Sequence, residues 1–481
     1  MMASNRVEGL RKRYAAVGQE HVFQYVDELG QNDLDGFLNT LEKLNIEKIT
    51  ERFKKTMELE GAHIISNNIE PLETCEFDSE VDNKSGGQDE WYEEGLRLIA
   101  QNKVATLVMA GGQGTRLGST LPKGFYKVGI PSGKSLFQIQ GERIVRLQQV
   151  AAEFAKVDKN SVVIPWLVMV SDATKKDTVD YFRHNNNFGL RDDQVFFFDQ
   201  GSLPAFTFDG KLILESKGKI STAPDGNGGI YSGLLESGIL DELKRRGVTY
   251  VHAYCVDNIL VRVADPRFVG YSALKKAQTG ALVVAKSSWD EKVGVICKKQ
   301  KKYAVLEYSE IPEELSREKR PDGTLLYNAG NICNHVFSLD FLYQTENIQH
   351  KLEYHIAKKK IKYYDSETGK SVAPEKNNGI KLERFIFDVF PFVDKLAILD
   401  VSRKEQFSPL KNAPGSGADC PETSREDLMN LHIRFAEKAG AQVIGAARRS
   451  FEISPLVSYN GEGLESLEGR VFSSPTLINE L

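Results

Sequence analysis

The segment that most constrains this chain is residues 106–124, TLVMAGGQGTRLGSTLPKG. Its first five residues are mostly apolar and predict a buried strand, which breaks into a glycine-rich turn. Because glycine has no Cβ, backbone N–H groups in such a turn can approach a bulky anion, and positive φ angles are permitted where the turn needs them. Arg116 and Lys123 add fixed positive charge beside the turn. These features predict a loop that binds several phosphates of a nucleotide.

Two better-known phosphate-binding motifs each fail here by one residue. The dinucleotide motif G-x-G-x-x-G requires a third glycine where Leu117 stands, and the glycine comes one position late at Gly118. The P-loop requires four residues between its first glycine and Gly-Lys-Ser, whereas residues 129–135, GIPSGKS, have three. Pro131 in that segment also lacks the N–H that would bind phosphate. Both motifs depend on spacing for their geometry, so both are disfavoured.

The overall charge does not attract a nucleotide. At 481 residues the chain exceeds one ordinary hydrophobic core, so two or three domains are expected. The hydrophobic share of 41% and the charged share of 27% are ordinary for a soluble globular protein. A formal net charge of −5 provides no general attraction to nucleic acid or to an anionic membrane, and we expect neither as a partner. A nucleotide must therefore be met by a local basic cluster.

Cysteine usage indicates a reducing compartment. The five cysteines are scattered and form no C-x-x-C, which argues against a disulfide scaffold or a structural zinc site. The amino terminus lacks the apolar core of a secretion signal, and no uninterrupted apolar segment reaches 18 residues. We expect a cytoplasmic protein. The cysteines are Cys75, Cys255, Cys297, Cys333 and Cys420.

Hydrophobic patterning predicts an α/β fold. Residues 1–60 carry apolar residues three and four apart, which predicts a small helical layer. From residue 91 helical segments alternate with short apolar runs, which implies a doubly wound, mostly parallel sheet. Such sheets bind ligands beyond the carboxyl ends of their strands, where the glycine loop falls. The expected strands are 106–110, 164–170, 195–198 and 249–255, and the expected helices are 91–100, 134–154 and one from Thr174 onward.

Composition shifts suggest the domain boundaries. Residues 76–90, EFDSEVDNKSGGQDE, are acidic and polar and predict a linker or surface loop. Two β-prone runs around residues 298–302 predict an antiparallel hairpin with a basic, solvated turn. A glycine-punctuated loop after residue 408 precedes an amphipathic helix over 425–439. The expected parts are an N-terminal helical region with a linker (1–90), a central domain (91–407) and a small C-terminal α+β domain (408–481).

Several single residues could carry chemistry, each with a plainer alternative. Asp257 closes an expected strand on the crevice side, where a carboxylate could hold a Mg²⁺ completed by phosphates and water, or could simply cap a turn. A second glycine-rich loop, residues 221–231, could bring Gly226 and Asn227 to a base or ribose, although such clusters are more often plain turns. Lys411 taken alone is typical of a solvated surface charge.

The sequence does not support nucleophilic catalysis. His252 lies in the middle of an expected strand and is assigned to core packing, and His335 is assigned a structural role rather than a place in a pocket. No cysteine lies near a histidine, and no G-x-S-x-G is present.

The glycine loop with Pro122-Lys-Gly124 resembles the signature of the UDP-sugar pyrophosphorylases, and most closely the eukaryotic-type UDP-N-acetylglucosamine pyrophosphorylases. The resemblance runs in order over about residues 90–415 and more loosely beyond. It implies a Rossmann-like nucleotidyltransferase core with a mixed, mostly parallel sheet and small terminal domains. The matching segments are Ala110–Gly118, Phe137–Gln140 with Glu142–Ile144, Ala223–Gly229, Val256–Leu260, Val293–Val295, Glu307–Ile311, Asn328–Ile332, Lys381–Glu383 with Phe387–Asp388, and Phe407–Ala413.

The resemblance implies a reaction between UTP and N-acetylglucosamine 1-phosphate that gives UDP-N-acetylglucosamine and pyrophosphate. Its implied cofactor is Mg²⁺, with Mn²⁺ as an alternative, held by Asp257. Arg116, Lys123 and Lys411 are the implied catalytic cations. The attacking phosphate monoester has a second pKa of about 6, so it is already largely dianionic at neutral pH and needs no general base.

The resemblance also implies the substrate contacts. The loop glycines would surround the nucleotide phosphates, a second group would contact uracil and ribose, and a third would surround the N-acetyl sugar. In that order the contacts are Gly111, Gly112 and Gly114; Gln200, Gly226 and Asn227; and Gly294, Glu307 and Asn331, with Lys411 at the phosphate of the sugar or of the nucleotide. Met109, Ala110, Tyr308, Phe387 and Asp257 are further implied substrate contacts. Thr222 departs from the family pattern, in which a larger apolar residue stands.

Other readings remain open from the sequence alone. Within the same class the sugar could be glucose or N-acetylgalactosamine. In a different class the chain could be an inactive regulator that binds a nucleotide sugar, although the four charged residues Arg116, Lys123, Asp257 and Lys411 speak against it. Association as a homodimer is also left open.

Overall fold

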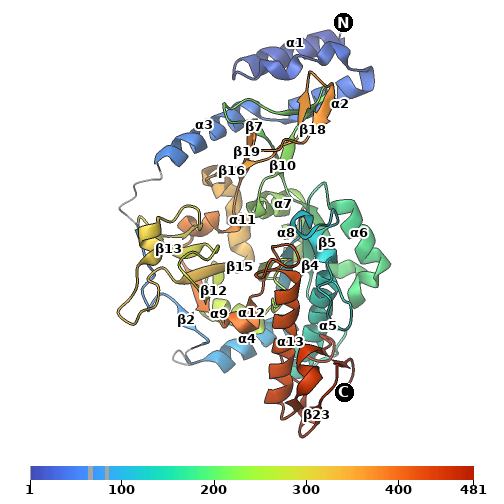
Figure 1. The fold of residues 1–481 in the computed structure, drawn as a ribbon, viewed down its shortest axis with the longest axis vertical. Helices are drawn as coiled ribbons and strands as arrows, with labels where there is room; N and C mark the ends of the chain where they lie inside the picture. Colours follow the sequence, from blue (N-terminus) through green and yellow to red (C-terminus); the bar gives the residue numbers. More distant parts are fainter. Residues whose placement is uncertain (1, 63–68, 82–85) are drawn as a thin grey trace. The chain divides into compact units, whose positions relative to one another are not determined.

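The computed structural model describes residues 2–62, 69–81 and 86–481 (Figure 1). The packing of the chain divides it into two units, each assembled from separate stretches of sequence. The larger unit comprises Asn68–Asp199, Ile230–Gln349 and Val389–Leu481, and the smaller unit comprises Met1–Asn67, Gln200–Gly229 and His350–Asp388. Both are discontinuous, whereas the domains expected from the sequence are continuous. The boundaries at 90/91 and 407/408 stay predictions.

The larger unit is built on a mixed sheet with the strand order β2-β20-β12-β15-β11-β3-β4-β5. Every neighbouring pair along this order is parallel except the two that β15 forms with β12 and β11. This confirms the predicted α/β class with a mixed, mostly parallel sheet. The strands are β2 (Asp78–Ser79), β20 (Leu396–Asp400), β12 (Thr279–Ala285), β15 (Ala329–Ser338), β11 (Tyr250–Cys255), β3 (Val104–Met109), β4 (Trp166–Val170) and β5 (Val195–Asp199).

The predicted strands and helices are present with small shifts at their ends. The four predicted strands correspond to β3, β4, β5 and β11, and every residue of β3 and β4 is buried, as is typical of parallel strands covered on both faces. The predicted helix 425–439 begins earlier, because Pro421 suits the first turn of a helix. The principal helices are α4 (Gln88–Ala100), α5 (Leu136–Ala155), α6 (Lys175–His184), α7 (Ile230–Glu236), α8 (Ile239–Arg245), α9 (Pro266–Leu274), α11 (Leu339–Ile348) and α13 (Pro421–Lys438).

Two glycines let α4 and α9 approach closely on the sheet. A Cβ at Gly95 would lie 1.8 Å from the carbonyl oxygen of Pro266, and a Cβ at Gly270 would lie 1.8 Å from that of Trp91. No side chain fits at either distance, so these helices can pack only with glycine at both positions. The Trp91 ring then contacts Tyr271 edge-on, with 4.8 Å between ring centroids.

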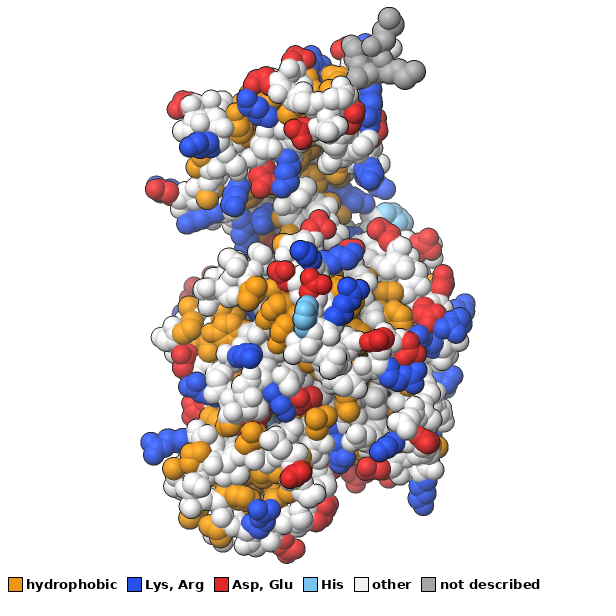
Figure 2. Space-filling view, turned by 90° about the vertical axis from the view of Figure 1, so that its right-hand side faces the viewer, with side chains coloured by type: hydrophobic (Ala, Val, Ile, Leu, Met, Phe, Trp, Pro, Cys, Tyr) orange, Lys and Arg blue, Asp and Glu red, His pale blue; other side chains and the backbone are white. Residues whose placement is uncertain are grey.

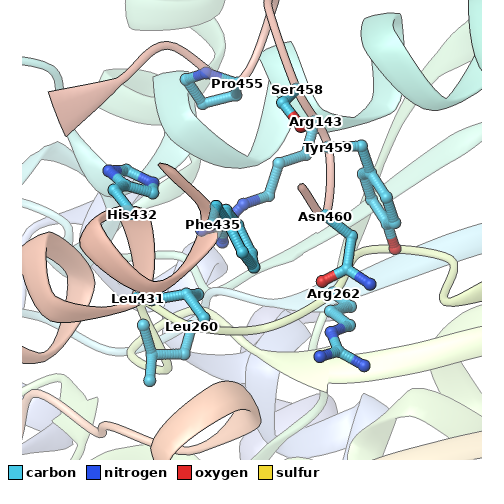
Figure 3. A pocket seen from close by; sticks show the side chains of 10 residues that line it. All are labelled: Arg143, Leu260, Arg262, Leu431, His432, Phe435, Pro455, Ser458, Tyr459 and Asn460. Carbon is cyan, nitrogen blue, oxygen red and sulfur yellow. The ribbon is translucent and has the colours of Figure 1, made fainter. Parts of the chain in front are cut away.

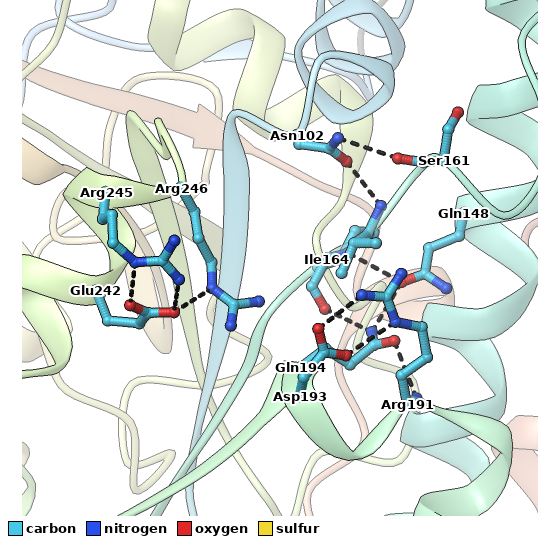
Figure 4. A network of polar contacts seen from close by, with 11 residues as sticks. Asn102, Gln148, Ser161, Ile164, Arg191, Asp193, Gln194, Glu242, Arg245 and Arg246 are labelled. Carbon is cyan, nitrogen blue, oxygen red and sulfur yellow. Dashed lines mark hydrogen bonds and ion pairs between the residues drawn. The ribbon is translucent and has the colours of Figure 1, made fainter.

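Amide side chains connect the segments just before β3, β4 and β5 (Figure 4). The Gln148 carbonyl oxygen accepts from the Ile164 N–H and from the Gln194 amide, each at 2.9 Å. Asn102 accepts from the Val163 N–H at 2.7 Å. These bonds satisfy backbone groups just before strands begin, and therefore fix the end of the sheet opposite to the glycine loop.

The two strand histidines are core residues, as predicted. His252 accepts at Nδ1 from the Ala264 N–H at 2.9 Å, and its Nε2 contacts Asn334 at 2.5 Å. Burial lowers the pKa of His252 to about 4 and that of His335 to about 3. Both rings are therefore neutral at pH 7.

Residues 76–90, for which the sequence predicts a linker or surface loop, are mostly irregular in the part that the structure describes, apart from a short strand and the start of a helix. Asp78–Ser79 forms the edge strand β2, and acidic side chains in and next to this strand form ion pairs with bases from other elements. Asp78 pairs with Lys275 at 2.8 Å, and Glu80 lies 3.8 Å from Arg262. Residues 88–90 already belong to α4, whereas residues 82–85 lie outside the described part.

The predicted hairpin is confirmed, with a shorter turn. β13 (Val295–Lys299) and β14 (Lys302–Leu306) pair antiparallel. Gln300 and Lys301 alone form the turn, with φ angles of 53° and 63°, as two-residue hairpin turns require. The expected turn over 298–302 was too long because Lys298 and Lys299 belong to β13, and Lys298 forms an ion pair with Glu76.

The smaller unit combines the predicted N-terminal helices with strands from far along the chain. Its helices are α1 (Met2–Ala15), α2 (Gln31–Lys43) and α3 (Ile46–Ala62), and its main sheet is β16 (His355–Lys359), β19 (Gly379–Glu383) and β7 (Phe206–Thr207). Phe53 of α3 stacks on Phe206 with 4.4 Å between centroids. The Gln19 amide donates to the Gly210 carbonyl at 2.8 Å and accepts from the Leu212 N–H at 2.8 Å.

The helices and one face of the molecule were compared with what a membrane span or a strongly charged surface would require. Among the described residues, none of the helices combines the length and the apolar character needed to cross a bilayer. Figure 2 shows a face of the molecule on which acidic and basic side chains are interspersed. This agrees with the small net charge of −5.

Candidate active site

The glycine loop leaves β3 at its carboxyl end and is closed on itself. The Gly114 N–H donates to the Leu121 carbonyl at 2.9 Å, and the Lys123 N–H donates to the Gly112 carbonyl at 3.1 Å. The Ser171 hydroxyl, just beyond β4, donates to the Gly111 carbonyl at 2.7 Å. The loop is thus anchored to two neighbouring strands of the sheet.

Three successive backbone donors in this loop face no protein acceptor. In the part of the chain that the structure describes, the N–H groups of Gly111, Gly112 and Gln113 form no hydrogen bond with other residues. A Cβ at Gly112 would meet nothing within 4 Å, so the space beside this backbone is open. Consecutive free N–H groups of this kind suit an anion. The positive φ angle of the loop falls at Gly118, at 76°.

Met109 and Ala110 precede these donors and are both buried. Ala110 donates its N–H to the Met169 carbonyl at 3.0 Å. These two residues therefore fix the backbone at the start of the loop.

Lys123 and Asp257 meet although they lie on different segments. The Lys123 Nζ lies 3.1 Å from Asp257 Oδ2, and the two side chains are 20% and 17% exposed. They meet because β11 and β3 are parallel neighbours in which Cys255 pairs with Met109. Arg116 is exposed, and the structure shows no ion pair for it among the described residues. The loop therefore offers one paired cation and one free cation.

The turn that carries Asp257 is held by side chains of α5. The Gln140 amide donates to the Val256 carbonyl at 3.0 Å. The Arg143 Nη1 donates to the carbonyls of Ile259 and Val261 at 2.7 and 2.9 Å. The backbone on both sides of Asp257 is thus fixed by buried bonds from the helix that follows the glycine loop.

Asn258 joins the Asp257 turn to the segment before Lys411. This buried amide donates to the Gln406 carbonyl at 2.7 Å and accepts from the Ser408 N–H at 3.0 Å. The Leu410 N–H in turn donates to the Asp257 carbonyl at 2.9 Å. Lys411 therefore directly follows a residue that is hydrogen-bonded to Asp257.

Lys411 begins a loop that closes at Asp419. The N–H groups of Lys411 and Asn412 both donate to the Asp419 carbonyl at 2.8 Å. Asp419 has a φ angle of 50°, in the left-handed region that is costly for a residue with a Cβ. Burial has the largest effect on the pKa of Asp419 and raises it. The positive charge of Lys411 lowers this pKa, and the negative charge of Asp257 raises it. The carboxylate therefore lies within the electrostatic reach of both site residues.

Gly294, Glu307 and Asn331 come together beside the hairpin. The Asn331 N–H donates to the Gly294 carbonyl at 2.8 Å, and a Cβ at Gly294 would lie 2.7 Å from Glu307 Oε1. A hydrogen bond with Cys255 raises the pKa of Cys333, and burial and the charges of Asp257 and Glu307 raise it further. These interactions link the group to the end of β11. Tyr308 is 49% exposed at the end of the hairpin.

The remaining predicted contacts belong to the smaller unit, where they also gather. The Gln200 amide donates to the Gly226 carbonyl, and Asn227 Oδ1 accepts from the Ile386 N–H at 3.0 Å. Gly226 has a φ angle of 89°, and a Cβ there would lie 2.2 Å from the Arg384 carbonyl oxygen. Only glycine fits this turn. Phe387, in the same segment as Ile386, is buried.

Asp257 fits the requirements of a Mg²⁺ ligand as a single carboxylate. In residues 2–62, 69–81 and 86–481 the structure shows no group of three or more His, Cys, Asp or Glu side chains that could hold a metal alone. Mg²⁺ keeps several waters and is commonly bound by one or two carboxylates plus substrate phosphates. A lone aspartate beside an anion-binding loop matches that arrangement.

The functional residues that the sequence did not single out are Gln140, Arg143 and Asn258. Each acts by hydrogen bonds to the backbone around Asp257. All three lie in segments that resemble the family, but their bonds to the Asp257 turn become visible only when α5 lies against that turn.

Comparisons with known proteins give one consistent result. The family described as UTP–glucose-1-phosphate uridylyltransferase matches residues 45–479. The chain is 44% identical to the UDP-N-acetylhexosamine pyrophosphorylase-like protein 1 of Homo sapiens, over 98% of this chain and 97% of that protein. It is 40% identical to the UDP-N-acetylglucosamine pyrophosphorylase of Saccharomyces cerevisiae, over 98% and 99%. The crystal structure of the uridine diphosphate N-acetylglucosamine pyrophosphorylase from Trypanosoma brucei in complex with inhibitor is similar with a TM-score of 0.83 and 28% identity, over 99% and 98%.

Proposed function

Since the chain belongs to the UTP–glucose-1-phosphate uridylyltransferase family, we propose that it converts UTP and N-acetylglucosamine 1-phosphate to UDP-N-acetylglucosamine and pyrophosphate. The names of relatives that match nearly its full length support this substrate pair. The five cysteines are free thiols, which supports a reducing compartment such as the cytoplasm for this enzyme.

The observation that carries the proposal is the arrangement at the carboxyl ends of β3 and β11. Three free N–H groups at Gly111–Gln113 lie in the same closed loop as Arg116 and Lys123, and Lys123 reaches Asp257. This is a site for a polyphosphate, because backbone donors and side-chain cations converge from one loop. The Lys123–Asp257 pair keeps two half-buried charges compensated before a substrate enters.

The chemistry needs positioning and charge compensation rather than proton transfer. A phosphate oxygen of the sugar phosphate attacks the α-phosphorus of UTP, and the bond from that phosphorus to the bridging oxygen breaks, so pyrophosphate leaves. The nucleophile is already ionised, because the second pKa of a phosphate monoester is about 6. The barrier is the approach of one anion to another, which Arg116, Lys123 and Lys411 reduce by alignment and compensation of charge.

Mg²⁺, or Mn²⁺ in its place, is part of the proposal. Asp257 would hold it, and the cation would compensate charge on the phosphates when bound. Asn258 and Arg143 keep the Asp257 turn in place for that contact through their backbone bonds.

The acetamido sugar is assigned to the group formed by Gly294, Glu307 and Asn331. A carboxylate and an amide can bond sugar hydroxyls and the N-acetyl group, and Gly294 leaves the space that a side chain would take from Glu307. Tyr308, whose side chain is exposed, stays a predicted substrate contact. The uridine contacts that the resemblance implies, Gln200, Gly226 and Asn227, stay predictions.

Pyrophosphate release with UTP and three sugar phosphates tests the activity directly. We expect turnover with N-acetylglucosamine 1-phosphate, slower turnover with N-acetylgalactosamine 1-phosphate, which differs only at the 4-hydroxyl, and least with glucose 1-phosphate. Faster turnover with glucose 1-phosphate than with N-acetylglucosamine 1-phosphate would contradict the assignment of an acetamido sugar. Absence of pyrophosphate with all three would leave a nucleotide-sugar-binding protein without this activity.

Removal of either loop cation should stop turnover without unfolding the protein. We expect Arg116→Ala and Lys123→Ala each to lower kcat about 10²–10³-fold, the effect typical of losing one transition-state donor. Lys127→Ala is the matched control, because it removes the same charge at an exposed position two residues beyond the short helix Lys123–Phe125. Rates close to those of the control, with unchanged thermal unfolding in all three variants, would remove the loop from the mechanism.

Asp257→Asn should weaken the binding of Mg²⁺. We expect the Mg²⁺ concentration at half-maximal rate to rise about tenfold, since an amide oxygen carries no net charge for a hard cation. Lys123→Ala separates the two roles of the aspartate, because it breaks the same ion pair but keeps the carboxylate. The residual activity of Lys123→Ala should therefore titrate with Mg²⁺ as wild type does. Equal Mg²⁺ titrations for Asp257→Asn and wild type would exclude Asp257 as the ligand.

A further inference from the structure

A pocket in the larger unit lies outside the residues assigned to substrates (Figure 3). It is bordered by α5, α13 and the segment around residues 455–460. It contains about 310 Å³ of space that no atom fills, part of it open solvent at the mouth, and its interior has room for an occupant about the size of one water molecule. The lining residues are Arg143, Leu260, Arg262, Leu431, His432, Phe435, Pro455, Ser458, Tyr459 and Asn460.

The lining is rich in hydrogen-bond donors and has no carboxylate. Arg143 is 5% exposed and extends from α5 toward the Phe435 ring, as Figure 3 shows. The structure gives Arg143 no ion pair with any described residue, and its two hydrogen bonds both use Nη1. Burial lowers the pKa of Arg143 to about 10, so its guanidinium is still charged at neutral pH. A buried positive charge without a counter-charge is costly.

The neighbouring bases do not remove this excess of positive charge. Arg262 is compensated, because its Nη2 lies 2.5 Å from Glu405 and its Nη1 lies 3.8 Å from Glu80. His432 accepts at Nδ1 from the Ile453 N–H at 3.2 Å, so its proton is on Nε2. Burial and the charges of Arg143 and Lys134 lower the pKa of His432 to about 3. The ring is therefore a neutral donor, and the uncompensated charge belongs to Arg143.

We propose that this pocket binds a single halide ion, chloride in the cell, beside the guanidinium of Arg143. A cation would be repelled, and a monatomic anion needs the least room in this narrow interior. The neutral His432 ring and Asn460 line the same pocket, and each side chain carries an N–H donor. The ion would compensate Arg143, whose Nη1 holds the carbonyls of Ile259 and Val261. It would therefore stabilise the turn that carries Asp257. This inference concerns a site of its own and does not depend on the proposed reaction.

Bromide offers a direct test on the unaltered protein. A crystal grown or soaked in sodium bromide should show an anomalous peak within about 3.5 Å of the Arg143 guanidinium, at hydrogen-bonding distance. Water alone at this position, with bromide bound elsewhere in the same crystal, would overturn the proposal.

Thermal unfolding tests the same site in solution. At equal ionic strength, we expect the unfolding midpoint to be about 2 °C higher in sodium chloride than in sodium gluconate, the size of shift that weak binding to the folded state produces. Asn460→Asp should abolish the difference, because its carboxylate takes the place of the ion. Asn160→Asp makes the same charge change at an exposed position and should keep the difference. An equal response of both variants to chloride, or no response of the wild type, would contradict halide binding in this pocket.

Discussion

The parallel pairing of β3 with β11 is the constraint on which the candidate site depends. Met109 and Cys255 are partners at the carboxyl ends of these strands, so the residues that follow them leave the sheet side by side. β3 continues into the free N–H groups of the glycine loop, and β11 continues into Asp257. The Lys123–Asp257 contact at 3.1 Å then joins the two exits. The site follows from register, because a different pairing would separate the cation from the carboxylate.

Buried hydrogen bonds, rather than the charged residues themselves, give this edge its shape. Asn258 satisfies backbone groups on two segments, and Arg143 satisfies two carbonyls from the far side of the same turn. Buried polar networks of this kind are rigid when every member is bonded. A reaction between two anions requires such rigidity, since its barrier is lowered by charges that are already in place.

The sequence predicted the features that depend on local pattern. Continuous apolar runs identified β3, β4 and β11, and the glycine loop and Asp257 stood at strand ends where ligands of α/β sheets bind. The resemblance to UDP-sugar pyrophosphorylases added the sugar and uridine residues. The ion pairs of Asp78 and Glu80 could not be predicted, because their partners, Lys275 and Arg262, lie almost 200 residues away. The packing of α3 on the sheet of β7, β19 and β16 also had no local signal in the sequence. The roles of Gln140 and Arg143 depend on the same kind of distant contact.

A crystal structure with UTP bound tests the central claim most directly, which is that the edge formed by β3 and β11 receives the nucleotide triphosphate. The account predicts phosphate oxygens on the N–H groups of Gly111, Gly112 and Gln113, with Arg116 and Lys123 contacting the same triphosphate. A triphosphate held by other residues, with these three N–H groups left in solvent, would contradict it.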